Sequence, residues 1–128
     1  MNMQQEWHEQ DAFWTAVEPV IFSEERHSDA PVEARNLIEK LDLKPGTPLL
    51  DLCCGTGRHS VEFARHGLEV VAVDRTRPYI DKAKEIARKA GVSIEFICED
   101  MRAFRRPEAF DAVANLLTSF GYFKDPEE

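Results

Sequence analysis

The chain has 128 residues, of which 43% are hydrophobic and 31% are charged, a balance typical of a single globular domain. Its net charge of −8 opposes binding to the phosphates of a nucleic acid. No apolar run approaches the length of a membrane span, and the polar start, MNMQQEWHEQ, lacks the apolar core of a signal peptide.

Residues 1–31 form the least regular part, which we predict to hold a short amphipathic helix and then a loop ending at Pro31. A domain over 32–128 then begins with a helix from Val32 to Leu43, because its apolar residues have the spacing of one helix face. The following KPGTP segment ends this helix and turns the chain.

Strand and helix patterns alternate after this turn. We predict strands over Leu49–Cys53, Glu69–Asp74, Ser93–Cys98 and Ala109–Leu116, with helices over Arg58–His66 and from Thr76 to Ala90. Alternation at this spacing predicts a parallel sheet with right-handed crossovers and helices on both faces. The fold class is therefore α/β, a three-layer αβα Rossmann-like sheet.

The last four residues, Asp125 to Glu128, have the pattern of a helix start, with a capping acid, a proline and two acids. We therefore expect a domain that is truncated after its fourth strand. The segment VANLLTSF would then lie at an open sheet edge, which favours self-association.

The three cysteines indicate a reducing compartment, because adjacent Cys53 and Cys54 have poor geometry for a mutual disulfide and Cys98 lies in a predicted strand. We therefore expect a cytoplasmic protein. The sequence has no spacing typical of a metal site, and we assign no metal ligand.

The segment LDLCCGTGR is the strongest functional signal. A buried strand ends in Asp51, the turn contains Gly55 and Gly57, and a helix begins at Arg58. The glycines let the backbone approach a ligand, and the helix start offers unpaired N–H groups to an anion. Asp51 adds a carboxylate, so the pattern favours a ligand that carries both an ammonium and a carboxylate group.

A dinucleotide is the competing ligand for such a turn. Its usual site has G-x-G-x-x-G or A, whereas this chain has Ser60 at the last position. Asp51 would also lie near the pyrophosphate, where two negative charges repel each other. Both departures disfavour a nicotinamide-dependent oxidoreductase, which remains an alternative.

Two further acids follow the next strands. Asp74 ends the second strand, where a carboxylate can accept hydrogen bonds from both hydroxyls of a ribose. Asp100 follows the third strand with Met101 beside it, a pair suited to the exocyclic amine and the ring face of adenine. An amino-acid tail, a ribose and an adenine in this order indicate S-adenosylmethionine.

The segments DLCCGTGRHS, VVAVDRT, FICEDMRAF and FDAVANLLTSFGYF resemble successive motifs of the Rossmann-like (class I) S-adenosylmethionine-dependent methyltransferases, over residues 32–124. The resemblance implies that Asp51, Gly55 and Gly57 line the methionine moiety, in a loop whose usual first glycine is Cys53 here. It also implies that Asp74, with Arg75 behind it, holds the ribose, that Asp100 and Met101 flank the adenine, and that Asn115 lies near the methyl donor and acceptor.

Each assignment has a structural alternative. Asp51 could cap a turn, Asp74 the following helix, Asp100 could be an ordinary loop acid, and Asn115 could mark a strand end. The basic cluster of Arg102, Arg105 and Arg106 is expected to be a solvated loop, and neither His59 nor His66 receives a catalytic role.

The expected function is methyl transfer to a small-molecule acceptor. No acid–base pair is evident, so we name no catalytic residue, which suits a donor already activated by its positive charge. A truncated cofactor-binding fragment without activity is the second hypothesis, and the oxidoreductase is the third. The sequence leaves the acceptor undetermined.

Overall fold

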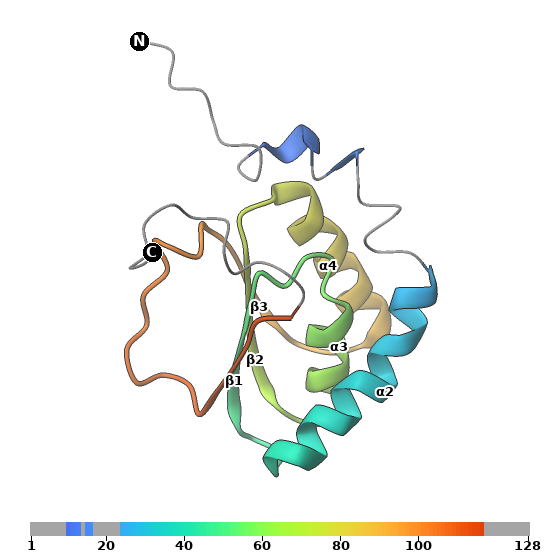
Figure 1. The fold of residues 1–128 in the computed structure, drawn as a ribbon, viewed down its shortest axis with the longest axis vertical. Coiled ribbons are helices and arrows are strands. Elements are labelled where there is room, and N and C mark those ends of the chain that lie inside the picture. The colour runs from blue at the N-terminus through green and yellow to red at the C-terminus, as the bar shows by residue number, and fades with distance from the viewer. Residues whose placement is uncertain (1–9, 14, 17–23, 117–128) are drawn as a thin grey trace.

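The computed structural model describes residues 10–13, 15–16 and 24–116 (Figure 1). Residues 11–13 and 15–16 are helical. The elements that follow are α2 (Glu24–Leu41), β1 (Pro48–Leu52), α3 (Arg58–Arg65), β2 (Glu69–Asp74), α4 (Arg77–Ala90), β3 (Glu95–Cys98) and β4 (Ala112–Ala114). The strands form one parallel sheet in the order β3-β2-β1-β4, which confirms the α/β Rossmann-like fold.

All three labelled helices lie on one face of the sheet (Figure 1). The connections from β1 to β2 and from β2 to β3 step in the same direction along the sheet, so right-handed crossovers put α3 and α4 on the same side. The chain then returns from β3 across the sheet to β4 through residues 99–111, which contain no helix. The second helical layer that alternation predicted is therefore absent from the described residues.

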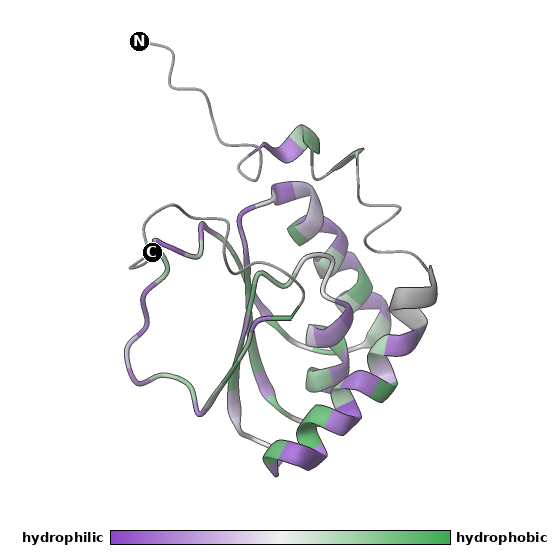
Figure 2. Ribbon diagram, in the orientation of Figure 1, coloured by the Kyte–Doolittle hydropathy of each residue, from purple (hydrophilic) through white to green (hydrophobic). Residues whose placement is uncertain are grey.

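The core lies between the sheet and this helical layer, where apolar residues line the facing surfaces (Figure 2). Leu49 of β1, Val70 of β2 and Phe63 of α3 are at most 5% exposed. Alternate strand residues face this core, because side chains of a strand point to opposite sides in turn. Asp51 and Asp74 share the parity of Leu49 and Val70, so the same alternation places them on the helix-covered side.

Helix α2 begins at Glu24, earlier than the predicted start at Val32, and it includes Pro31. The predicted loop before Pro31 is therefore wrong. A proline inside a helix removes one backbone hydrogen bond, but Ala30 and Ala34 are both almost fully buried in this part of α2. Packing against α3 thus favours a continuous helix, and the domain boundary at residue 31 stays a prediction.

Strand β4 is shorter than the predicted strand Ala109–Leu116, and the strand that it pairs with in the described part of the chain is β1. Strand β4 is an edge strand of the sheet that the described residues form, and Val113 in this strand is 61% exposed. Much of VANLLTSF lies outside the described residues, so self-association at this edge stays a prediction. None of the helices in the described ranges is both long and apolar enough to traverse a lipid bilayer.

Candidate functional site

The three acids singled out from the sequence lie at one edge of the sheet. Asp51 is level with Ala72 of β2, while Asp74 is level with Cys98, two residues before Asp100. Because parallel strands all end at the same edge, the acids follow one another across β1, β2 and β3. The sheet order also reverses between β1 and β4, and ligands of open α/β sheets bind outside the strand ends at such a reversal.

The loop from β1 to α3 is shaped by three left-handed residues. Cys53, Gly55 and Gly57 have φ of 60°, 58° and 78°. A Cβ on Gly57 would lie 2.9 Å from the Cβ of Ala83 in α4, so this position requires glycine for its backbone and for its packing. The loop is thereby pressed against α4 beside the carboxyl edge of the sheet.

Cys53 is the exception to this glycine pattern. A left-handed backbone costs a residue with a Cβ about 1–2 kcal/mol, which explains why glycine suits this position. The Cys53 thiol lies 3.4 Å from the thioether of Met101, which follows β3. The structure therefore brings Cys53, in the loop after β1, into contact with Met101, which the resemblance assigns to the adenine.

Asp74 binds two backbone segments. Its Oδ2 accepts the N–H of Gly55 at 2.9 Å, and its Oδ1 accepts the N–H of Thr76 at 2.9 Å. Burial raises the pKa of Asp74, while the hydrogen bonds from Thr76 and Gly55 oppose this rise. Thr76 begins α4 without a capping bond from its own side chain, so Asp74 serves the helix start that the alternative interpretation proposed. The same carboxylate also positions the glycine loop.

Asp51 is 2% exposed and accepts a short hydrogen bond from the Ser60 hydroxyl in the first turn of α3. The pKa of Asp51 is raised to about 7, chiefly by burial and also by the charge of Asp74, while the Ser60 hydrogen bond and the charge of Arg58 oppose the rise. Asp51 is thus a buried acid that is poised to lose its proton when a cation comes near.

The first turn of α3 is polar and buried. Arg58, His59 and Ser60 are at most 6% exposed. The N-cap residue, Gly57, supplies no side-chain hydrogen bond, and this turn contains no acid, so the helix start is electropositive. His59 Nε2 lies 2.9 Å from Glu33 Oε2 of α2, and burial lowers the pKa of His59. This contact explains why His59 is buried and gives it a structural role.

Asp100 and Met101 start the connection from β3 to β4. Asp100 forms a double contact with Arg102, at 2.7 and 3.0 Å. Arg75 Nε lies 3.9 Å from Asp100 Oδ2, and Arg75 Nη1 lies 3.6 Å from Asp11. The described N-terminal residues thus reach the same edge of the sheet as the acids.

Asn115 directly follows β4, level with the end of β1. Both polar atoms of its side chain are buried, and neither has a hydrogen-bond partner in the part of the chain that the structure describes. A buried amide without partners is unfavourable by about 1–3 kcal/mol, which a bound ligand with matching groups would recover.

Two polar partners were missed by the sequence interpretation. Ser60 was read only as a departure from the dinucleotide pattern, although a hydroxyl three residues after Gly57 was the available signal. Arg102 was assigned to a solvated cluster, yet its side chain is 28% exposed and paired with Asp100. Arg106 pairs with Glu95 at 2.7 Å, but Arg105 and Arg106 are both exposed, so these two fit the solvated description.

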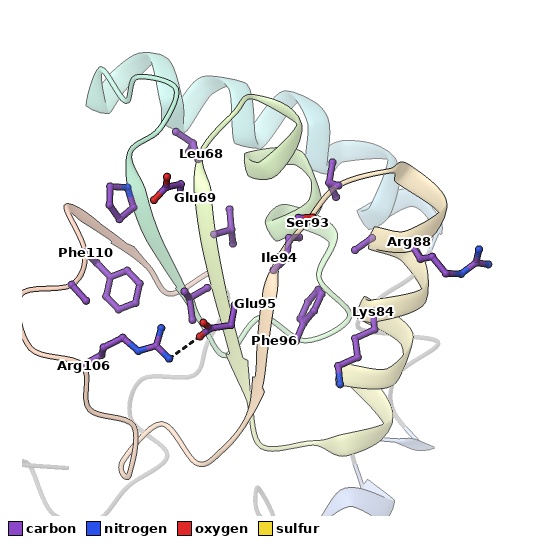
Figure 3. A pocket seen from close by; sticks show the side chains of 16 residues that line it. Leu68, Glu69, Lys84, Arg88, Ser93, Ile94, Glu95, Phe96, Arg106 and Phe110 are labelled. Atoms are coloured by element: carbon purple, nitrogen blue, oxygen red, sulfur yellow. Dashed lines mark ion pairs between the residues drawn. The ribbon is translucent and has the colours of Figure 1, made fainter.

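A surface pocket lies at the opposite end of the sheet (Figure 3). Its lining includes Pro48, Glu69 and Glu95, the first residues of β1, β2 and β3, together with Phe110 and Arg106 from the last connection. None of the acids at the carboxyl edge lines it, so it is separate from the candidate site. Within residues 10–13, 15–16 and 24–116, no group of three or more potential ligands could hold a metal ion.

Comparison with known proteins gives a consistent result. A family model described as "Methyltransferase domain" matches residues 49–128. A ubiquinone biosynthesis O-methyltransferase of Coxiella burnetii is 32% identical over 88 residues, which cover 68% of this chain and 37% of that protein. A 23S rRNA (uracil(1939)-C(5))-methyltransferase of Azoarcus is 31% identical over 87 residues, covering 68% of this chain and 19% of that protein.

The fold also resembles a solved structure, that of a S-adenosylmethionine-dependent methyltransferase from Thiobacillus denitrificans in complex with S-adenosyl-L-homocysteine. It is 27% identical, with a TM-score of 0.62, and the match covers 70% of this chain and 37% of that one. The chain therefore spans little more than a third of the length of either this protein or the Coxiella enzyme.

Proposed function

The chain belongs to the methyltransferase domain family, and we propose that it binds S-adenosylmethionine along the carboxyl edge of its sheet for methyl transfer to a small-molecule acceptor. The observation that carries the proposal is the succession of Asp51, Asp74 and Asp100 on neighbouring strands beside the glycine loop. Because the chain spans 37% of the Coxiella relative, cofactor binding and methyl transfer need separate tests.

The methionine end of the cofactor fits the start of α3. Its ammonium would meet Asp51, a buried acid whose one described hydrogen-bond partner is the Ser60 hydroxyl. Its carboxylate would meet the N-terminus of α3, where the N-cap residue Gly57 supplies no side-chain hydrogen bond and the first turn contains no acid. An opposite charge beside Asp51 stabilises the ionised acid, so binding relieves the unfavourable burial of this carboxyl group.

The nucleoside end fits the next two strands. Asp74 would accept hydrogen bonds from the ribose hydroxyls, with Arg75 behind it. The hydrogen bonds that Asp74 accepts from the N–H groups of Gly55 and Thr76 would keep its carboxylate in place. Asp100 and Met101 would flank the adenine, and Cys53 would lie against the same ligand because its thiol contacts Met101. When bound, S-adenosylmethionine supplies a methyl group on a positively charged sulfur.

Asn115 would lie on the acceptor side, because it follows β4 beside the reversal of the strand order. Its amide offers one donor group and one acceptor group, both of them buried. A small acceptor with an amine or hydroxyl would satisfy these atoms and be held near the donor, and this positioning is the main contribution that the transfer needs.

A small acceptor is favoured over RNA by charge. The chain carries a net charge of −8, and two of the three arginines in the basic cluster, Arg102 and Arg106, are paired with acids. The name of the Azoarcus relative nevertheless gives an RNA substrate for that protein, so RNA belongs among the acceptors tested. We also propose a cytoplasmic location, supported by three cysteines that all carry free thiols.

Calorimetry with S-adenosylhomocysteine and with NAD tests the binding proposal. We expect heat only from the adenosyl ligand, whereas binding of NAD alone would support the oxidoreductase alternative. Transfer from S-adenosylmethionine labelled on its methyl group, offered with small amines, small alcohols and RNA, then identifies the acceptor class. Binding without transfer to any of them would support the second alternative, a cofactor-binding fragment without activity.

A further inference from the structure

Arg102 holds Asp100 in a planar arrangement. Arg102 Nε lies 3.0 Å from Asp100 Oδ1, and Nη2 lies 2.7 Å from Oδ2, so the guanidinium and the carboxylate face each other as two forks. The backbone N–H of Arg102 donates to the same Oδ1 at 2.9 Å. Three hydrogen bonds from one residue therefore fix both the position and the plane of this carboxylate.

These contacts leave one side of the carboxylate open. Each carboxylate oxygen can accept two hydrogen bonds. Oδ1 already accepts two, one from the backbone N–H and one from the Nε of Arg102. Oδ2 receives one, because Arg75 Nε at 3.9 Å is too distant for a hydrogen bond. Within the described residues, one acceptor direction of Oδ2 is thus unused.

Asp100 accepts hydrogen bonds and does not donate them at neutral pH. The pKa of Asp100 is lowered, chiefly by the hydrogen bond from the Arg102 side chain, so the carboxylate stays ionised. The unused direction of Oδ2 therefore suits an N–H donor and disfavours a carbonyl oxygen. Asp100 also lies next to the proposed ribose site, because the N–H of Glu99 donates to the carbonyl oxygen of Asp74 at 3.0 Å.

We propose that Arg102 is a positioning residue for base specificity, which orients Asp100 so that Oδ2 receives the exocyclic amine of adenine. This inference rests on the proposed binding of an S-adenosyl ligand. It implies that the site distinguishes S-adenosylhomocysteine from S-inosylhomocysteine, whose base carries a carbonyl oxygen in place of that amine. A hydrogen bond to a charged acceptor gives a preference of about tenfold to a hundredfold.

Asp100 also organises the turn that follows it. The backbone N–H groups of Ala103 and Phe104 donate to its carbonyl oxygen at 2.9 and 3.2 Å. Loss of Arg102 could therefore loosen the turn and lower the affinity for any ligand. The ratio of affinities for the two nucleosides separates the roles, because a general loosening weakens both ligands alike.

The experiment measures both affinities by calorimetry for the wild type and for Arg102→Ala, Arg102→Lys and Arg105→Ala. We expect the preference for the amine to fall below about threefold in Arg102→Ala, and to be intermediate in Arg102→Lys, which keeps the charge but loses the fork. Arg105→Ala is the matched control, since Arg105 donates to the exposed carbonyl oxygen of Phe104 and its removal changes the net charge equally.

The outcomes separate the two proposals. A wild type that binds neither nucleoside overturns the proposed function. A wild type that binds both equally overturns the role of the Asp100–Arg102 pair alone. A wild-type preference that persists in both Arg102 variants shows that Arg102 only supports the turn.

Discussion

Replacing Asp51 with asparagine should stabilise the unliganded protein at high pH while weakening cofactor binding. The folded-state pKa is about 7, against 3.8 for the ordinary carboxyl group. Well below pH 3.8 the acid is neutral in both states. As the pH rises towards 7 the unfolded chain loses its proton first, so the free energy of unfolding falls. The full effect of a shift this size is about 4 kcal/mol and is reached above pH 7.

Between pH 5 and pH 8 this one group should lower the free energy of unfolding of the wild type by about 2–3 kcal/mol. Asparagine imitates the neutral acid at every pH, so the Asp51→Asn variant lacks this contribution and should gain stability relative to the wild type as the pH rises. Urea unfolding at pH 5, 6, 7 and 8 measures the difference. A difference between the two proteins that stays constant with pH would falsify the raised pKa of Asp51.

Binding should change in the opposite sense. The ammonium of the ligand needs an ionised Asp51, so the affinity of the wild type for S-adenosylhomocysteine should fall about tenfold from pH 8 to pH 6. The Asp51→Asn variant should bind weakly at both values. An affinity of the wild type that does not vary with pH would show that the ligand does not meet this carboxylate.

Three further substitutions test the loop. Asp74→Ala should weaken binding of S-adenosylhomocysteine by about 1–3 kcal/mol in calorimetry, while Asp74→Asn, which retains an acceptor for Gly55, should lose less; equal losses would mean that the charge is what matters. Gly57→Ala should lower the free energy of unfolding by about 1–3 kcal/mol in urea because of its φ of 78° and the contact with Ala83, and an unchanged midpoint would contradict this packing. Cys53→Gly removes a left-handed side chain but makes the unfolded chain more flexible, so we expect a change within about 1 kcal/mol in urea and equal or tighter ligand binding; a tenfold loss of affinity would give the thiol a direct binding role.

Local patterns were sufficient to predict most elements. The strand Glu69–Asp74 has the predicted bounds, because a buried apolar run is a local signal. Helix α4 ends at Ala90 as predicted, because Gly91 takes the left-handed conformation that ends a helix. The common edge of Asp51, Asp74 and Asp100 was also predictable, since βαβ alternation forces the strands to be parallel. The sequence alone thus determined the fold class and the family resemblance.

Contacts between distant residues could not be read in the same way. The early start of α2 depends on packing of Ala30 and Ala34, and the pairing of Arg102 with Asp100 depends on how the turn after β3 folds. The sequence analysis predicted a loop where α2 begins and a solvated position for Arg102. Tertiary burial outweighed the local preference in each place.

The protonation of Asp51 is the clearest property that tertiary structure decided. The sequence places an acid at the end of a strand, but its pKa of about 7 arises because the fold buries it and places the charge of Asp74 on the next strand, against the opposing effect of the Ser60 hydrogen bond. Sequence order determines which residue types reach the edge of the sheet, through the strong local preferences of strands and turns. The chemistry of those residues depends on desolvation and neighbouring charges, which exist only once the chain has folded.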